Sequence, residues 1–179
     1  MIKESTVRPK PQNNNAKIAL LVAIFFSVGG ILAYAFAEKY KGVIGLVALC
    51  FITTSILFYT KYIAPIFFYD VIIDSEGTPL FVVRQRTGKR EITLARVEFA
   101  DIKDAKIESR EERRKHKTAG GVLKYNYGPT MNPKNSCRLF IKSRYENAEI
   151  LIEVSEEYKD MLLSYAKIAR EMRIEEDEE

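Results

Sequence analysis

Two long uncharged runs near the start of the sequence constrain the fold more than any other feature. The first, "IALLVAIFFSVGGILAYAFA", covers residues 18–37, and the second, "GVIGLVALCFITTSILFYT", covers residues 42–60. An α-helix rises about 1.5 Å per residue, so each run is long enough to cross the hydrocarbon core of a bilayer, which is about 30 Å thick. The short connection at residues 38–41 suits two antiparallel helices. The sequence therefore predicts a two-helix transmembrane hairpin over residues 17–66, with helices at about 18–37 and 42–64.

The first run also has features of a secretory signal peptide. A basic segment precedes it, and Ala35-Phe36-Ala37 has the A-x-A form of a cleavage site. The run is longer than the usual apolar segment of a signal peptide, which is about 7 to 15 residues, and a second run follows it closely. The hairpin is therefore the favoured interpretation, and cleavage after Ala37 is the alternative.

Small residues recur at every fourth position along the first run, at Gly29, Ala33 and Ala37. This spacing allows two helices to approach each other closely in lipid. We expect these three residues to form a packing face of the hairpin. The alternative is that they are ordinary small residues of a membrane helix.

The distribution of Lys and Arg around the two runs predicts the orientation of the hairpin. Four basic residues precede the first run, the connection holds Lys39 and Lys41, and Lys61 and a basic stretch at residues 84–90 follow the second run. Cytoplasmic flanks of membrane spans carry the excess of Lys and Arg. Both termini are therefore predicted to lie in the cytoplasm.

The charge of the chain belongs mainly to the hairpin and its flanks. The net charge is +4, from 28 Lys and Arg against 24 Asp and Glu. Residues 1–65 hold seven of the basic and two of the acidic residues, which leaves 21 basic and 22 acidic residues for the remainder. A nearly neutral domain is a poor ligand for a polyanion, because that affinity comes from many phosphate contacts. Nucleic acid is thus not an expected partner.

The remainder of the chain has the pattern of a β-rich domain that ends in one helix. Runs of β-branched and aromatic residues alternate with turn signals such as Glu76-Gly77 and Thr87-Gly88. Apolar residues recur with helical spacing from Tyr158 to Met172, after Ser155 as a candidate N-cap. Seven strands are predicted, at residues 68–74, 79–86, 90–97, 102–108, 122–127, 138–143 and 148–154.

Seven strands followed by one helix is also the order of elements in the pleckstrin-homology (PH) domain. Together with the hairpin, residues 67–173 resemble the PH-like domains of small bacterial membrane proteins, and the stretch "FVVRQRTGKREITLARVEFADI" supports the resemblance. The resemblance implies a seven-stranded, partly open barrel of two sheets capped by the helix, on a hairpin in the bacterial cytoplasmic (inner) membrane. Lipid-binding PH domains hold phosphoinositides near the loop between their first two strands. Here that loop, residues 74–78, is acidic, which argues against a headgroup site there.

The expected organisation has four parts. They are a disordered cytoplasmic tail, the hairpin, the PH-like domain and an acidic tail, at residues 1–16, 17–66, 67–174 and 175–179.

Two basic segments are predicted to face the membrane. The first strand starts where the second membrane helix ends, so in an antiparallel meander the second turn and the segment after the fourth strand return to the bilayer. Their basic residues are Arg84, Arg86, Lys89, Arg90, Arg110, Arg113, Arg114, Lys115 and Lys117. Each can contribute about 1 kcal/mol near an anionic leaflet, so we expect these residues to dock the domain on the inner leaflet. The alternative is that they are solvated, with Glu111 and Glu112 partly cancelling the second segment.

The sequence predicts no enzyme, no cofactor and no metal site. His116, the only histidine, has Lys115 and Lys117 as neighbours and is interpreted as a solvated loop residue. Cys50 and Cys137 have neither disulfide nor metal-ligand spacing, so both are interpreted as buried thiols.

An irregular stretch at residues 124–135 is a candidate protein-contact surface. Tyr125, Tyr127 and Met131 are residue types found at adaptable interfaces, and packing against the sheet is the alternative. The predicted function is a membrane-anchored, non-enzymatic interaction or scaffolding module for a membrane or cytosolic protein, a second copy of the chain included. The alternative function is a sensor of anionic lipid whose basic loops bind lipid headgroups.

Overall fold

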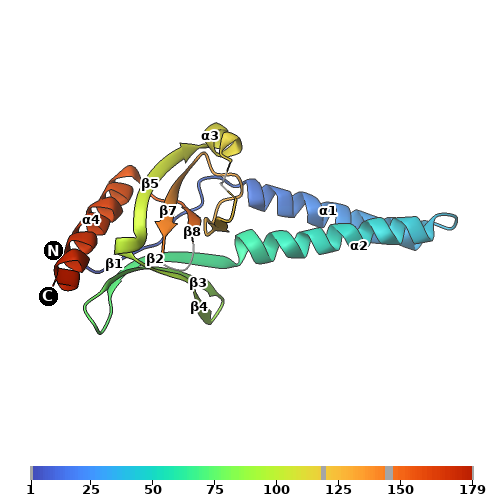
Figure 1. Cartoon of the computed structure of the whole chain (residues 1–179). Coiled ribbons are helices and arrows are strands. Elements are labelled where there is room, and N and C mark those ends of the chain that lie inside the picture. Colours follow the sequence, from blue (N-terminus) through green and yellow to red (C-terminus); the bar gives the residue numbers. More distant parts are fainter. Residues whose placement is uncertain (1, 118–119, 144–146, 179) are drawn as a thin grey trace.

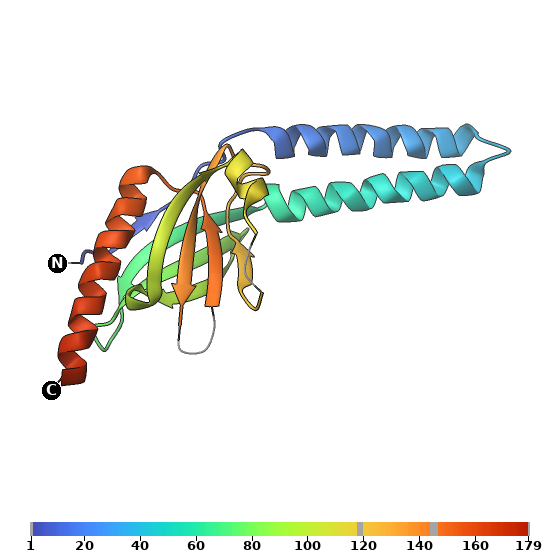
Figure 2. The same ribbon diagram turned by 45° about the horizontal axis from the view of Figure 1, so that its top comes forward.

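The computed structural model describes residues 2–117, 120–143 and 147–178, with side chains up to residue 174. A long helical hairpin projects from one end of a β domain (Figures 1 and 2). Helices α1 (Asn15–Phe36) and α2 (Lys41–Phe58) form the hairpin, and α2 continues as a π-helical turn, η1 (Tyr59–Ile63). The prediction of two long apolar helices followed by a β-rich domain is confirmed.

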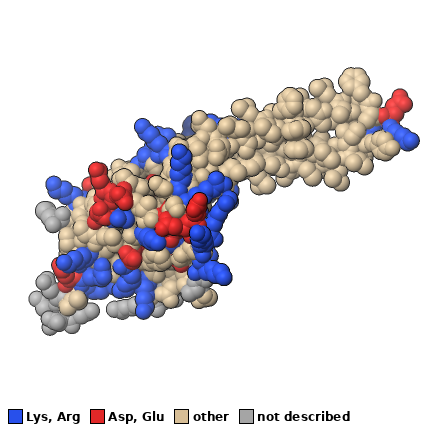
Figure 3. Space-filling model, turned by 90° about the horizontal axis from the view of Figure 1, so that it is seen from above, with Lys and Arg blue, Asp and Glu red and all other residues tan. Residues whose placement is uncertain are grey.

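Both helices are long and apolar enough to cross a membrane, over Asn15–Phe36 and Lys41–Ile63. Large apolar side chains point outward, such as Leu21 and Phe25 with exposed fractions of 67% and 73%. The hairpin surface is uncharged between its base and its tip (Figure 3). A core helix of a soluble protein would bury its apolar face, so this surface fits a lipid environment better than water.

The two helices pack through small residues other than the predicted ones. Gly30 lies against Ala48, where a methyl group on the glycine would come within 2.9 Å of the Ala48 Cβ. A methyl group on Gly29 would meet nothing within 4 Å, Ala33 is exposed, and Ala37 lies beyond the end of α1. The predicted small-residue face therefore does not form the α1–α2 contact. One residue of offset matters because it turns the side chain by about 100° around the helix.

Eight strands are described, in two four-stranded sheets. In the first sheet β2, β3 and β4 form an antiparallel meander, and β1 pairs with the free edge of β2. In the second sheet β5, β7 and β8 are antiparallel, and β6 pairs in parallel with β8. The strands are β1 (Ser5–Val7), β2 (Pro65–Ile73), β3 (Pro79–Thr87), β4 (Arg90–Glu98), β5 (Ile102–Ser109), β6 (Leu123–Asn126), β7 (Asn135–Lys142) and β8 (Asn147–Ile152).

This architecture confirms two sheets and a C-terminal helix, but it corrects the expected seven-stranded, partly open barrel. The two sheets do not close into a barrel over the described residues, and β6, which follows β5 in the chain, lies at the opposite edge of the second sheet from β5. The additional strand, β1, lies in the segment predicted to be a disordered tail, and Ser5–Val7 pairs with residues 69–71. Without β1, this part of β2 would be an exposed sheet edge with unpaired backbone groups.

The core lies between the two sheets and helix α4 (Glu156–Glu178). Phe99 is fully buried, and its ring meets Tyr165 of α4 edge-on, with ring centroids 5.8 Å apart. Helix α4 packs on β5 and on the 3-10 turn η2 (Phe99–Asp101), which confirms the predicted C-terminal helix. It lies at the end of the domain opposite the hairpin (Figures 1 and 2).

Candidate membrane-proximal site

The direction of β2 determines which loops lie near the hairpin. Pro65, the first residue of β2, follows the π-helical turn and pairs with Thr87 at the end of β3. The turn between β3 and β4 is therefore next to the base of the hairpin. Helix α3 (Arg110–Lys115), which follows β5, lies beside the start of α1 in both ribbon views (Figures 1 and 2). Both predicted basic segments thus lie at the hairpin end of the domain.

Arg84, in the first basic segment, is held by carboxylates of its own sheet. Its Nε donates to the buried Asp70, and its Nη1 donates to Glu91 at 2.5 Å. The hydrogen bond to Asp70 raises the pKa of Arg84. Thr6 of β1 also donates to Asp70, at 2.7 Å, so this ion pair is part of the sheet. The charge of Arg84 is compensated internally.

The second basic segment contains a short helix rather than only a loop. Ser109 caps the N-terminus of α3 in a capping box with Glu112, and hydrogen bonds from Ser109 lower the pKa of Glu112. The guanidinium of Arg113 donates to Ser136 Oγ at 2.5 Å and to the carbonyl of Pro133 at 2.6 Å. Burial lowers the pKa of Arg113. Like Arg84, Arg113 has a structural role.

The remaining predicted basic residues have no ion pair with a described residue. They are Arg86, Lys89, Arg90, Arg110, Arg114, Lys115 and Lys117. Arg86 is half-buried and lies over the ring of Phe68, 5.3 Å from its centroid. The other six are exposed.

A buried ionic cluster lies next to α3. Arg138 of β7 donates to Glu108 at 2.8 Å and to Glu149 at 2.7 Å, and all three side chains are buried. Burial opposes the charge of Arg138, but the hydrogen bonds and the attraction of both carboxylates raise its pKa overall. His116 lies with Nε2 3.1 Å from Glu149 Oε1 and Nδ1 3.8 Å from Glu108 Oε1. The interpretation of His116 as a solvated loop residue is therefore wrong.

The candidate protein-contact residues are partly used in packing. The rings of Tyr125 and Tyr127 are stacked with centroids 5.9 Å apart, and the Tyr127 hydroxyl donates to the carbonyl of Leu94 at 3.4 Å. Tyr125 remains exposed, and Met131 is half-buried. A protein contact through these residues stays a prediction.

The segment before α1, residues 8–14, is fixed to the β domain, and we call it the strap. Gln12 donates from its backbone to Thr130 Oγ1 at 2.9 Å and from Nε2 to the carbonyl of Asn135 at 2.6 Å, and its Oε1 accepts from the backbone of Lys134 at 2.9 Å. Asn13 donates to the carbonyl of Met131 at 3.3 Å. Asparagine and glutamine carry no hydrophobic pattern, so this attachment leaves no signal that sequence reasoning could detect.

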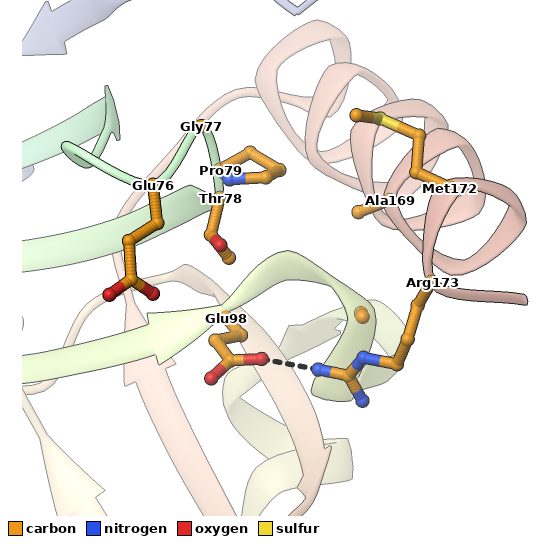
Figure 4. A pocket seen from close by; sticks show the side chains of 9 residues that line it. Glu76, Gly77, Thr78, Pro79, Glu98, Ala169, Met172 and Arg173 are labelled. Atoms are coloured by element: carbon orange, nitrogen blue, oxygen red, sulfur yellow. Dashed lines mark hydrogen bonds and ion pairs between the residues drawn. The ribbon is translucent and has the colours of Figure 1, made fainter. Parts of the chain in front are cut away.

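Cavities lie at both ends of the domain. At the hairpin end, a cavity of about 410 Å³ lies between the strap, the first turn of α1 and the start of β2. At the α4 end, a cavity of about 220 Å³ is lined by Glu76, Glu98 and Arg173 (Figure 4). Arg173 is neutralised there by Glu98 and by Asp101, the latter at 3.0 Å.

The two cysteines differ in environment. Cys137 is buried in the core, as predicted, and burial raises the pKa of its thiol to about 12. Cys50 is exposed on the surface of α2, contrary to the prediction of a buried thiol. Among the described residues, no group of three or more His, Cys, Asp or Glu side chains is arranged to hold a metal ion.

Comparisons with known protein families, with curated proteins and with solved structures find no match to this chain. The functional argument therefore depends on the geometry of the chain itself.

Proposed function

We propose that this protein is a membrane-anchored, non-enzymatic interaction module. A PH-like domain is held at the inner leaflet of the bacterial cytoplasmic membrane in one orientation and presents its outer surface to a protein partner. The observation that carries the proposal is the pairing of β1 with β2, because these strands flank the two apolar helices.

The β1–β2 pairing restricts the topology. Residues 5–7 precede α1 and residues 69–71 follow α2, and the two segments are neighbours in one sheet. If α1 crosses the membrane, the chain must return through α2 for these segments to meet. Cleavage after Ala37 would remove β1 and the strap, so the pairing supports the hairpin over a signal peptide. The excess of Lys and Arg on this side favours the cytoplasm.

The strap supports a fixed orientation of the domain. The domain is attached on one side through the continuation of α2 into β2, and on the other through the hydrogen bonds of Gln12 and Asn13. Two attachments restrict rotation of the domain about the hairpin more than one linker would. Anchoring confines the domain to the membrane plane, which raises its effective concentration for a membrane partner.

The unpaired basic residues at the hairpin end support an alternative, a sensor of anionic lipid. Each Lys or Arg close to an anionic leaflet contributes about 1 kcal/mol, and the contribution falls with salt. Six exposed cations of the β3–β4 turn and of the α3 region could thus make the position of the domain depend on lipid charge.

The two functions differ in their dependence on lipid composition. Two variants in a Cys50→Ser background would each carry one fluorophore, on K89C in the β3–β4 turn or on E76C near α4. The fluorescence of each would be measured in vesicles whose lipid headgroups carry a quencher. The proposal expects quenching at position 89 and not at position 76, with or without anionic lipid. Quenching at position 89 that requires anionic lipid favours the sensor, and equal quenching at both positions contradicts the fixed orientation.

The partner is tested in the membrane. Crosslinking of the full chain in intact membranes, followed by mass spectrometry, is expected to give one stoichiometric protein partner or a second copy of the chain. A purified protein that instead turns over a small molecule would contradict a non-enzymatic role.

A further inference from the structure

The cavity at the hairpin end collects positive charge from two elements. Arg8 and Lys10 come from the strap, and Lys17 comes from the first turn of α1. Among the described residues, no Asp or Glu lines the cavity and none forms an ion pair with any of the three cations. The cavity at the α4 end differs, because its Arg173 is neutralised by carboxylates (Figure 4).

The position of Lys17 is unfavourable for the helix that carries it. The N-terminus of a helix has a partial positive charge, so a lysine in the first turn is repelled and an acid is favoured. The first turn of α1 holds no acidic residue, and its N-cap Asn14 makes no side-chain cap hydrogen bond. A bound anion would compensate both the lysine and the helix end.

The cationic wall is built on ordered backbone. Pro9 and Pro11 alternate with Arg8 and Lys10, and proline fixes the backbone φ near −65°. The next residue, Gln12, is hydrogen-bonded to the segment at residues 130–135. The cations of the strap therefore lose little backbone freedom when they bind a ligand.

The opposite wall is apolar and lies where the helical hairpin ends. Tyr62 and Ile63 of η1 and Ile66 of β2 line it. Tyrosine is enriched at the interface of membrane and water, and Tyr59 and Tyr62 occupy the end of the α2 span. The cavity is thus at the depth of lipid headgroups, if the hairpin spans the membrane as proposed above. A second cavity at this end, of about 340 Å³, has Lys61 as its one charged lining residue in the described part of the chain.

We propose that this cavity binds one anionic phospholipid, with its phosphate group between Arg8, Lys10 and Lys17 and its glycerol and upper acyl carbons on Tyr62, Ile63 and Ile66. The volume of about 410 Å³ lies within the range of about 300 to 1,000 Å³ that is usual for small-molecule sites. The proposal rests on the membrane hairpin of the proposed function and adds a defined ligand site to it. The bound lipid joins the strap, α1 and β2.

The test uses the full chain, delipidated in mild detergent and titrated with short-chain phosphatidylglycerol or phosphatidylcholine, with native mass spectrometry as the readout. We expect one phosphatidylglycerol per chain and at least about tenfold weaker binding of phosphatidylcholine. The variant R8Q/K10Q/K17Q should bind phosphatidylglycerol at least about tenfold more weakly, because each cation near an anionic lipid counts for about a factor of five.

The matched control is K89Q/R90Q/K115Q, which removes one Arg and two Lys from the same end of the domain outside the cavity. It should bind phosphatidylglycerol like the parent chain, and neither variant should melt below the parent chain by more than a few degrees, because all six residues are exposed. Equal loss of binding in both variants, or equal binding of the two lipids, would overturn the site. Competition by millimolar glycerol phosphate would reassign it to soluble phosphate esters. Lipid binding in detergent does not depend on whether the hairpin spans a membrane. Failure of the membrane topology would instead be detected by cysteine labelling in cells, at residues 38 and 76.

Discussion

Arg138 is a buried guanidinium held between two buried carboxylates. Replacing it with methionine would remove the guanidinium that donates to both Glu108 and Glu149, although His116 remains near both. Removing one partner of a buried ion pair typically costs about 3 to 5 kcal/mol, because an uncompensated charge stays buried. We therefore expect R138M to lower the free energy of unfolding by about that amount, measured as a lower melting temperature of the full chain in detergent.

The control for R138M removes the charges of the cluster together. Replacement of a whole buried ion pair by neutral residues is often nearly neutral for stability. The triple variant E108Q/R138M/E149Q should thus regain most of the lost stability. A triple variant that is less stable than R138M would show that packing, rather than charge, dominates at this place.

Glu153 makes stability depend on pH. Its carboxylate is buried and accepts hydrogen bonds from the backbone of Thr130 at 2.7 Å and from the Thr130 hydroxyl. Burial raises the pKa of Glu153 above its ordinary value, despite the opposing effect of these hydrogen bonds. The folded state therefore binds the proton more tightly than the unfolded state. The resulting stabilisation is complete below the ordinary pKa and is lost as the pH rises through the raised pKa.

The variant E153Q isolates the pH dependence that comes from Glu153, because the glutamine side chain does not titrate. Melting temperatures of both proteins between about pH 4 and about pH 8 should show the parent losing stability relative to E153Q as the pH rises. A difference between the two proteins that stays constant with pH would contradict the assignment.

The hairpin offers a matched pair of adjacent glycines. A side chain at Gly30 would collide with Ala48, whereas one at Gly29 would meet nothing within 4 Å. We expect G30V to separate α1 from α2 and to lower the melting temperature in detergent, and G29V to have little effect. Both changes carry the same helix propensity cost, so the difference reports packing alone. Equal effects of the two substitutions would contradict the observed helix contact.

The strap offers a matched test residue and control residue, Gln12 and Asn14. The Gln12 side chain makes three hydrogen bonds to the backbone of residues 134–135, and the Asn14 side chain makes no cap hydrogen bond. Q12A should therefore speed hydrogen–deuterium exchange at the backbone amides of residues 12–14, and N14A should leave this exchange slow. Peptide mass spectrometry over time measures both rates. Fast exchange in the parent chain would contradict a fixed strap.

The elements that sequence alone predicted are those with a strong periodic signal. The two apolar runs and the strands from β2 to β5 are long and patterned, and tight turns at Gly77 and Gly88 adopt the positive φ that glycine allows. Strand β1 has three residues, which is too short for a recognisable alternation. The buried charges of Arg138 and Glu149 lie within apolar strand segments, but their pairing depends on strand register. Register and helix rotation are tertiary properties, which explains why the exact site residues were missed.

The chain as a whole forms a closed arrangement, in which both ends of the hairpin enter one domain. The strap and β1 lead into α1, and α2 leads into β2, so the hairpin is attached at both of its ends. If the hairpin spans a membrane as proposed, a movement of the domain relative to the bilayer requires the strap to detach. The cavity proposed to hold a lipid lies between the strap and β2, so a bound lipid would oppose this detachment.

The closed arrangement predicts that the turn at residues 38–41 and the β domain lie on opposite sides of the membrane. In a Cys50→Ser background, E38C should react with a membrane-impermeant maleimide in intact cells, and E76C only after permeabilisation. Both positions are exposed, and Cys137 gives no background because it is buried and its thiol pKa is raised. Labelling of E76C in intact cells would contradict the cytoplasmic domain. Cleavage after Ala37 with α2 still in the membrane would leave the labelling of both positions unchanged but would give a shorter chain on a gel, so chain length separates a signal peptide from the intact hairpin.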